Sequence, residues 1–315
     1  MTVDAVAPFD AQAAATNRIE VCESDWPLSA LTREEVALAL ITGVDGAAYR
    51  PVGAAMAIDA EGRRSGSLSS GCLERDVALH ALSVIRDGVP RQLRYGRGSP
   101  FLDITLPCGG GLDITVLPAP APEMVAQIRA QLAARGPVDL AIRPDGCITT
   151  GTLAGATFSL RIRPEIRFVI LGKGPETASF ARIVTHAGYG AEVFTDGETA
   201  AEAGIGRPLP AGHWPDDLEI DPYTAVAMFF HDHEHEPLFL ARALQSPAFF
   251  VGAQGSLRAH QSRCQALAEL GVPAERIAAL ASPFGLIPST RDPRMLAVSV
   301  LAQILSRAAQ LQGRT

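Results

Sequence analysis

Residues 167–196 read RFVILGKGPETASFARIVTHAGYGAEVFTD, and this stretch decides the fold of the C-terminal half of the chain. An apolar strand runs into a glycine turn that opens a helix, and the next apolar strand ends in an acid. Gly172 and Gly174 form the turn, and Asp196 follows about 24 residues later, close to the ~20 of a dinucleotide-binding fingerprint. The stretch therefore predicts a Rossmann-type nucleotide fold.

The glycine turn carries the chemistry of this prediction. Without side chains the backbone can approach a pyrophosphate, which then lies against unpaired N–H groups at the positive end of the helix. Asp196 would accept a hydrogen bond from a ribose hydroxyl. Lys173 and Pro175 crowd the loop, and Thr177 stands where a third glycine is usual. We expect a nucleotide or another phosphate-bearing molecule here, and the alternative is a Rossmann turn that has lost its ligand.

Strands and helices keep alternating towards the C-terminus, which predicts a doubly wound parallel sheet covered on both faces. Loops at the carboxyl ends of such strands bind ligands. One such loop follows the apolar run AVAMFF, and VGAQGS, residues 251–256, is a second glycine loop. The candidate binding residues of the two loops are His231, Asp232, Gly252, Gly255, Ser256 and Arg258. The arginine suits a phosphate, and an ordinary turn with a surface arginine is the alternative.

The run HDHEHE, residues 231–236, predicts no structural metal site. Its histidines alternate, and alternate side chains converge on one face only in an extended strand, whereas this run lies where a strand ends. We expect the start of the run to form a loop at the edge of the sheet and the rest to be solvated surface.

The N-terminal half predicts a smaller α/β domain around a short sheet. Apolar runs at 35–43 and 54–60 predict strands. The segment SSGCLERDVALHALSVIRDG, residues 69–88, has apolar residues at helical spacing and predicts a helix that Ser70 caps and Gly88 ends.

The tetrapeptide LDIT occurs at 102–105 and again at 112–115, and the copies predict two strands that flank the glycine loop LPCGGG. A proline-alanine segment then leads to a short helix and to a hairpin that turns at Asp145–Gly146. The expected organisation is a flexible N-terminal arm at 1–28, a first α/β domain at 29–118, a linker helix and hairpin at 119–165, and a Rossmann-like domain at 166–315.

The five cysteines, an odd number without CxxC spacing, predict reduced thiols rather than a zinc site. Cys72 lies near the start of the predicted helix, a position that favours the thiolate, and Cys108 lies in a loop followed by three glycines. The glycines would let a flat ligand come up against the sulfur. We expect Cys108 to be functional, whereas for Cys72 alone we favour core packing over a functional thiol.

The composition excludes two classes of partner. There are 27 Lys and Arg residues against 34 Asp and Glu residues, a formal net charge of -7, and no basic run could follow a nucleic-acid backbone. No apolar stretch approaches the ~20 residues of a membrane helix, and the N-terminal region lacks the pattern of a signal peptide. We expect a cytoplasmic protein that binds neither nucleic acid nor membrane.

Several motifs taken together resemble those of the XdhC/CoxI family over a span from about Glu35 to Leu305. Proteins of this family bind molybdenum cofactor and insert it into xanthine dehydrogenase, carbon monoxide dehydrogenase and related molybdenum hydroxylases. The motifs that carry the resemblance are Arg50-Pro51 with Gly53, GSLSSGCLE at 66–74, Cys108-Gly109-Gly110, FVILGKG at 168–174, His231-Asp232-His233, FFVGAQGS at 249–256 with Arg258, and SPFGL at 282–286.

The resemblance implies an accessory protein, not an enzyme, that carries the molybdenum cofactor (molybdopterin). The Cys108 thiolate would hold the molybdenum as a soft ligand, helped by Cys72, while the Rossmann half docks the pterin phosphate or a nucleotide. The cofactor-binding residues implied in the N-terminal half are Arg50, Gly71, Cys72, Glu74, Cys108, Gly109 and Gly110. The implied partners are a molybdenum hydroxylase apoenzyme, a cofactor sulfurase and a second copy of the chain in a homodimer.

Departures from the family pattern leave alternatives open. GKGP stands at 172–175 where the family usually has Gly-Ala-Gly-His, and Ile287-Pro288 follows SPFGL where an aspartate and a glycine are usual. The first alternative is an NAD-dependent oxidoreductase that uses the same Rossmann half, with Cys108 or His231 near the transferred hydride. The second is a redox-sensing or scaffold protein whose thiols pair.

Overall fold

The computed structural model describes residues 19–69, 71–99, 106, 109–210, 213–230 and 236–311, with the side chain of Cys72 outside this description. The chain divides into two units, Met1–Pro164 and Glu165–Thr315. Among the described residues, no helix is long and apolar enough to cross a membrane.

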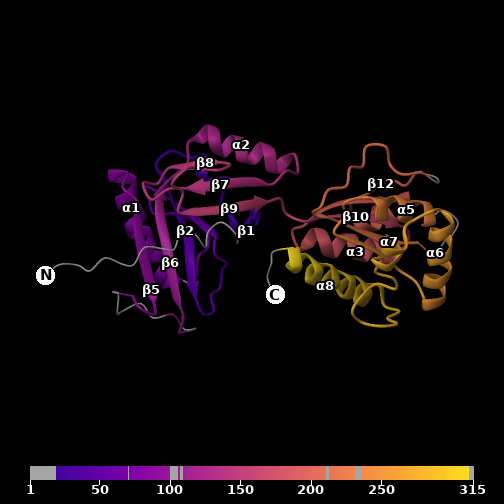
Figure 1. Ribbon diagram of the computed structural model, residues 1–315. Coiled ribbons are helices and arrows are strands. Elements are labelled where there is room, and N and C mark those ends of the chain that lie inside the picture. Colours follow the sequence, from indigo (N-terminus) through magenta and orange to yellow (C-terminus); the bar gives the residue numbers. More distant parts are fainter. Residues whose placement is uncertain are drawn as a thin grey trace. The chain divides into compact units, whose positions relative to one another are not determined.

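The C-terminal unit is built on one five-stranded sheet whose strands all run parallel (Figure 1). Its strands are β10 (Arg167–Gly172), β11 (Gly190–Thr195), β12 (Arg207–Pro208), β13 (Thr224–Phe229) and β14 (Phe250–Ala253). Their order in the sheet is β12-β11-β10-β13-β14. The chain therefore enters at the centre, builds outwards to one edge, and then crosses over to build the other half.

Helices cover both faces of this sheet. They are α3 (Pro175–His186), α4 (Gly197–Ala203), α5 (Glu236–Gln245), α6 (Leu257–Glu269), α7 (Ala274–Ala278) and α8 (Pro293–Leu311). Alternate residues of β10 face opposite ways. Phe168 and Ile170 pack with α3 and α8, whereas Val169 and Leu171 pack with α5 and α6. This arrangement confirms the expected doubly wound, Rossmann-like α/β fold.

The N-terminal unit contains a five-stranded antiparallel sheet, a four-stranded sheet and two α-helices in its described part (Figure 1). The strands are β1 (Ile19–Cys22), β2 (Val36–Asp45), β3 (Ala55–Asp59), β4 (Arg64–Gly66), β5 (Arg91–Gly96), β6 (Gly111–Pro118), β7 (Val138–Ile142), β8 (Ile148–Thr150) and β9 (Phe158–Arg163), and the helices are α1 (Gly71–Asp87) and α2 (Pro122–Ala133). The sheet orders are β4-β3-β2-β6-β5 and β1-β9-β7-β8.

Strand β2 lies at the centre of the five-stranded sheet and is buried on both faces. Ala37, Ala39 and Ile41 pack in a core with α1. Leu38 and Leu40 pack in a second core with α2 and the four-stranded sheet. Burial on both faces requires an apolar residue at every position, which is why this strand reads as a continuous apolar run.

Residues 19–28 are not part of a flexible arm, so the boundary expected at residue 28 is wrong. Strand β1 pairs in parallel with β9, with Ile19 opposite Leu160. Trp26 is buried, and its indole N–H donates to the Gly53 carbonyl at 2.9 Å. A four-residue strand shows no period, and its partner lies about 140 residues further along the chain. Local sequence therefore did not reveal β1.

The segment 119–165 is not a linker between domains, which corrects a second boundary. It forms α2, the hairpin of β7 and β8, and β9. Val125 and Ile128 of α2 share a core with Leu38 of β2 and Leu140 of β7. A shared core makes this segment part of the N-terminal domain.

The structure places the second LDIT copy but not the first. Residues 112–115 belong to β6, as expected, and their neighbour on the outer side is β5, which the sequence pattern missed. The first copy, at 102–105, lies outside the described residues.

Trp26→Ala should lower the free energy of unfolding by about 3–5 kcal/mol, because it removes a buried indole together with the donor to the Gly53 carbonyl. Trp26→Phe keeps most of the buried area and should cost clearly less. Urea unfolding followed by circular dichroism measures both losses. A loss below about 1 kcal/mol for the alanine variant would contradict the placement of residues 19–28 in the core.

Candidate functional site

In the N-terminal unit, the loops that the sequence predicts to bind the cofactor lie at one end of the five-stranded antiparallel sheet. Gly111, at the start of β6, lies opposite Asp45 at the end of β2 and opposite Gly96 at the end of β5. The predicted residues on the loops of this end are Arg50 after β2, Gly71 and Glu74 at the start of α1, and Gly109 and Gly110 before β6. Cys108 and the side chain of Cys72 lie outside the described residues, so the expected thiols stay predictions.

The glycine loop fits closely against the end of β5. The backbone N–H of Arg97 donates to the Gly110 carbonyl at 2.9 Å, and the Arg97 guanidinium donates to the Gly109 carbonyl at 3.3 Å. A side chain at Gly96 would collide with the Gly110 carbonyl, so only glycine allows this approach. A Cβ on Gly109 would meet no atom of the described residues within 4 Å. Of the described part of the loop, Gly110 is therefore held against the end of β5, whereas Gly109 is exposed.

Two acids of α1 fix the start of this helix at the same end of the sheet. The Tyr95 hydroxyl donates to Asp76 at 2.6 Å and ties the helix to the end of β5. Burial raises the pKa of Tyr95, which keeps it a neutral donor. Glu74 accepts hydrogen bonds from the Leu68 N–H at 3.0 Å and the Ser67 hydroxyl at 2.8 Å. Glu74 therefore clamps the turn before the helix.

Arg50 is held by a carboxylate on a neighbouring segment. Its guanidinium donates to Asp25 at 2.6 Å, and about a third of its side chain (34%) is exposed. The indole of Trp26 contacts the same loop through Gly53. An anionic ligand at Arg50 would thus have to compete with Asp25.

Sequence reasoning missed a group of charged residues at this end of the sheet. Arg94 donates to Asp113 at 2.6 Å, and this hydrogen bond raises the pKa of Arg94. Arg97 lies 3.5 Å from Asp45 and is two-thirds exposed. The four charged residues of this group, Asp45, Arg94, Arg97 and Asp113, each lie within two residues of a glycine. That proximity was the sequence signal that could have revealed them. The exposed guanidinium of Arg97 supplies hydrogen-bond donors beside the glycine loop.

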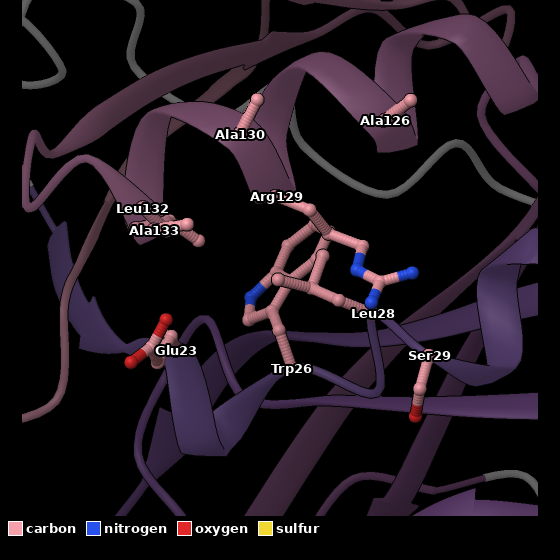
Figure 2. A pocket seen from close by; sticks show the side chains of 9 residues that line it. All are labelled: Glu23, Trp26, Leu28, Ser29, Ala126, Arg129, Ala130, Leu132 and Ala133. Carbon is pink, nitrogen blue, oxygen red and sulfur yellow. The ribbon is translucent and has the colours of Figure 1, made fainter. Parts of the chain in front are cut away.

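A hollow of about 650 Å³ lies between α2 and the segment after β1, which includes the 3-10 helix η2 (Glu23–Asp25) (Figure 2). Its lining residues are Glu23, Trp26, Leu28, Ser29, Ala126, Arg129, Ala130, Leu132 and Ala133. No residue singled out from the sequence lines it. Small side chains on the exposed face of a helix read as ordinary solvated surface, so the pattern gave no sign of this hollow.

The first Rossmann turn has the expected glycines but is closed by the protein's own contacts. A side chain on Gly172 would collide with the Phe229 carbonyl, and Gly174 has φ 86°, so both positions need glycine. The Gly174 N–H donates to the Thr199 hydroxyl at 2.9 Å. Pro175 begins α3 and has no N–H to offer. The donors that a pyrophosphate would use are thus partly engaged and partly missing.

Asp196 is engaged in the same way. It is the N-cap of α4, and the Thr199 N–H that donates to it at 2.8 Å holds the pKa of its carboxyl below the usual value. Glu176 adds a carboxylate to the first turn of α3, where it would repel a phosphate. The protein's own contacts therefore already occupy part of what the pyrophosphate and ribose of a dinucleotide would use, and nucleotide binding stays a prediction.

Gly252 of the second glycine loop has a packing role. It lies inside β14, and a Cβ there would come within 2.6 Å of the rings of both Phe250 and Phe284. The glycine lets Phe284 pack against the strand.

The rest of this loop leads into α6. Ser256 caps the helix by accepting a backbone N–H at 3.1 Å, and Gly255 and Arg258 are exposed. His231 and Asp232, expected on the neighbouring loop, lie outside the described residues. Within the described residues, Arg258 is the exposed, positively charged side chain that this loop contributes to the edge of the parallel sheet.

A buried ion pair that sequence reasoning missed fastens this edge of the sheet. Arg263 of α6 is 3% exposed, and Glu236 at the start of α5 is 1% exposed. The expectation that Glu236, the last residue of HDHEHE, belongs to solvated surface is therefore wrong. Arg263 donates to Glu236 at 2.8 Å and to the Gln254 carbonyl at 2.8 Å. It also donates to the Ser282 hydroxyl. One arginine thus joins the start of α5, the turn after β14 and the SPFGL segment, whereas from the sequence it reads as surface.

Comparisons with known proteins agree with this architecture. A model of the XdhC and CoxI family matches residues 30–96, and a model of the XdhC Rossmann domain matches residues 168–304. The chain is 34% identical over 276 residues to the molybdenum cofactor insertion chaperone PaoD of Escherichia coli (strain K12), which covers 85% of this chain and 82% of that protein.

A second relative and a solved structure extend the comparison. The chain is 24% identical over 318 residues to a protein of Bacillus subtilis (strain 168) named as a probable xanthine dehydrogenase component, which covers 87% of this chain and 93% of that protein. The crystal structure of a xanthine dehydrogenase from Bacillus halodurans superposes with a TM-score of 0.73 at 19% identity and covers 92% of this chain and 96% of that chain. At that identity the superposition supports the fold alone.

Glu236→Gln should lower the free energy of unfolding by about 3–5 kcal/mol, because it leaves Arg263 as an unpaired buried charge. The double variant Glu236→Gln/Arg263→Met removes that charge as well and should recover most of the loss. Urea unfolding of both variants measures the difference. Equal losses of unfolding free energy in the single and the double variant would show that the charge of the pair contributes nothing to stability.

NAD at about millimolar concentration should raise the melting temperature of the protein by less than about 1 °C, because Thr199 occupies the Gly174 N–H and Pro175 offers none. A thermal-shift assay with NAD and ATP measures this. A rise of several degrees that Gly174→Val abolishes would restore the nucleotide site expected from the sequence, and with it the oxidoreductase alternative.

Proposed function

The chain belongs to the XdhC and CoxI family, and on that premise we propose that it binds the molybdenum cofactor as cargo and inserts it into a molybdenum hydroxylase of the xanthine dehydrogenase or carbon monoxide dehydrogenase type. The observation that carries the proposal is the 34% identity, over 85% of this chain, to a protein named as a molybdenum cofactor insertion chaperone. In this role the protein is an accessory factor and catalyses no reaction.

The glycine-loop end of the five-stranded sheet supports a place for the cargo. Gly71 and Gly109 are both exposed, and in the part of the chain that the structure describes a Cβ on either would meet nothing within 4 Å. The backbone there is accessible to a flat ring system. We place the molybdenum at the Cys108 thiolate, one residue before Gly109, with Cys72 as a second thiol at the start of α1.

Charged side chains at the same end support binding of the phosphate of the cargo. Arg97 is two-thirds exposed and is fixed beside the glycine loop through its backbone. Arg50 belongs to another loop of the same end and is paired with Asp25. Guanidinium groups bind phosphate through paired N–H donors. In the proposed complex the phosphate takes donors from Arg97, and from Arg50 in competition with Asp25.

The family resemblance extends the proposal to partners. The cargo must leave for a hydroxylase apoenzyme, which is the first partner. A cofactor sulfurase, which would act on the bound cargo before delivery, is the second. A second copy of the chain, in a homodimer, is the third.

Cys108→Ala should reduce bound cofactor by about tenfold or more while changing the melting temperature little, because a loop thiol buries little apolar area. Cys72→Ala should reduce binding less and stability more, since α1 packs on the sheet. Bound pterin per protein, melting temperature and activation of a cofactor-free hydroxylase measure these effects. Full binding and full activation by Cys108→Ala would remove the thiol from the mechanism.

The assignment itself is tested by expressing the protein in cells with and without cofactor biosynthesis and identifying any pterin released on denaturation. We expect a molybdopterin-derived pterin only from cells that make the cofactor. Its absence from protein made in competent cells would contradict the proposed function.

A further inference from the structure

Tyr49 is the one exposed aromatic side chain in the part of the chain that the structure describes. It is 65% exposed, whereas every other described Phe, Tyr and Trp is buried or half-buried. Folding normally removes most of an aromatic ring from water, because burial of its apolar surface is favourable. The ring of Tyr49 is therefore apolar surface that this fold leaves accessible to a ligand.

The loop that carries Tyr49 is fastened on the C-terminal side of the ring. It spans residues 46–54, between β2 and β3. The Arg50 guanidinium donates to Asp25 at 2.6 Å, and the Gly53 carbonyl accepts from the Trp26 indole N–H at 2.9 Å. The three residues before Tyr49 are glycine and alanine, so no bulky neighbour in sequence covers the ring. A ring on a fastened loop loses little conformational freedom when it binds a ligand.

This loop starts beside the glycine loop. A Cβ built on Gly46 would lie 3.6 Å from the Cα of Gly110. Tyr49 follows Gly46 by three residues, so their Cα atoms are at most about 11 Å apart. Gly109 is exposed, and its carbonyl accepts from the two-thirds-exposed guanidinium of Arg97 at 3.3 Å. One end of the sheet thus brings together an exposed aromatic ring, an exposed guanidinium and exposed glycine backbone.

We propose that Tyr49 binds the flat ring system of the cargo by stacking, while the Arg97 guanidinium takes its phosphate. An aromatic side chain stacks on a flat heteroaromatic ring because the interaction uses the π-faces of both. Proteins bind unpaired nucleic-acid bases in the same way, with an aromatic platform for the base and cations for the phosphate. The inference rests on the proposed function, to which it adds the residue that recognises the ring, and it uses no thiol.

A protein partner fits Tyr49 less well than a small flat ligand does. A stable protein interface buries about 800 Å² on each partner. Tyr49 follows three small residues, and the next residue, Arg50, is already engaged with Asp25. One exposed ring beside small residues offers the apolar area of a single stacked ring, which is far less than such an interface needs.

The test uses the full-length protein made in cells without cofactor biosynthesis and titrated with molybdenum cofactor released from a purified molybdenum enzyme. Protein-bound cofactor is separated by gel filtration and quantified as its fluorescent oxidised pterin. Tyr49→Ala should raise the dissociation constant about tenfold, because the stacking platform is lost. Tyr49→Phe keeps the ring and should stay within about twofold of the wild type. The matched control is Leu79→Ala, since Leu79 of α1 is also 65% exposed, and it should leave the affinity unchanged.

The melting temperature of all three variants should stay within about 1 °C of the wild-type value, since exposed side chains contribute little to stability. Equal cofactor affinities of the wild type and Tyr49→Ala would overturn the inference and leave the proposed function standing. Equal weakening by Tyr49→Ala and Tyr49→Phe would also overturn it, because the hydroxyl and not the ring would then be responsible.

Two further outcomes separate the inference from its neighbours. If Tyr49→Ala keeps its cofactor affinity but no longer activates a cofactor-free hydroxylase, Tyr49 contacts the client protein and the stacking role is wrong. If the wild-type protein itself binds no cofactor, the proposed function fails, and the inference that rests on it fails with it.

Discussion

Burial of the central strands on both faces is the constraint on which the rest of the structure depends. In the N-terminal unit, alternate residues of β2 belong to two different cores, with Ile41 on one side and Leu40 on the other. In the C-terminal unit β10 is divided in the same way between Ile170 and Leu171. With both faces covered, the edges and ends of each sheet are what remains for binding.

The ends of the strands differ in how far the protein satisfies its own polar groups. At the first Rossmann turn, the Thr199 hydroxyl accepts from the Gly174 N–H, and the Thr199 N–H donates to the carboxylate of Asp196. At the next loops, a buried arginine joins three segments. At the glycine-loop end of the N-terminal unit, in contrast, Gly71 and Gly109 are exposed, and no other described residue crowds their backbones. The proposed function therefore places the flat cargo at the glycine-loop end of the N-terminal unit.

The two units thus differ in how closely they match the binding sites that the family resemblance predicts. The Rossmann unit keeps the strand order and glycines of a nucleotide-binding fold, while Thr199 occupies the Gly174 N–H and Pro175 has no N–H. The N-terminal unit brings together loops that lie far apart in the sequence, with Arg50 on one and Arg97 beside another. In the proposed function, a chaperone that holds its cargo through the N-terminal unit would need no nucleotide in the Rossmann turn.

The sequence alone determined the alternating strands and helices of the C-terminal unit, the helix that begins at Gly71 and the family resemblance, because each rests on local periodicity or on short motifs. It did not determine strand β1 or the shared core of residues 119–165, since their partners lie far away in the chain. Nor did it reveal the pairing of Glu236 with Arg263 or the occupation of the Gly174 N–H by Thr199. Those contacts join residues about 25 positions apart or more, and only the tertiary structure decides which distant side chain reaches a given donor or charge.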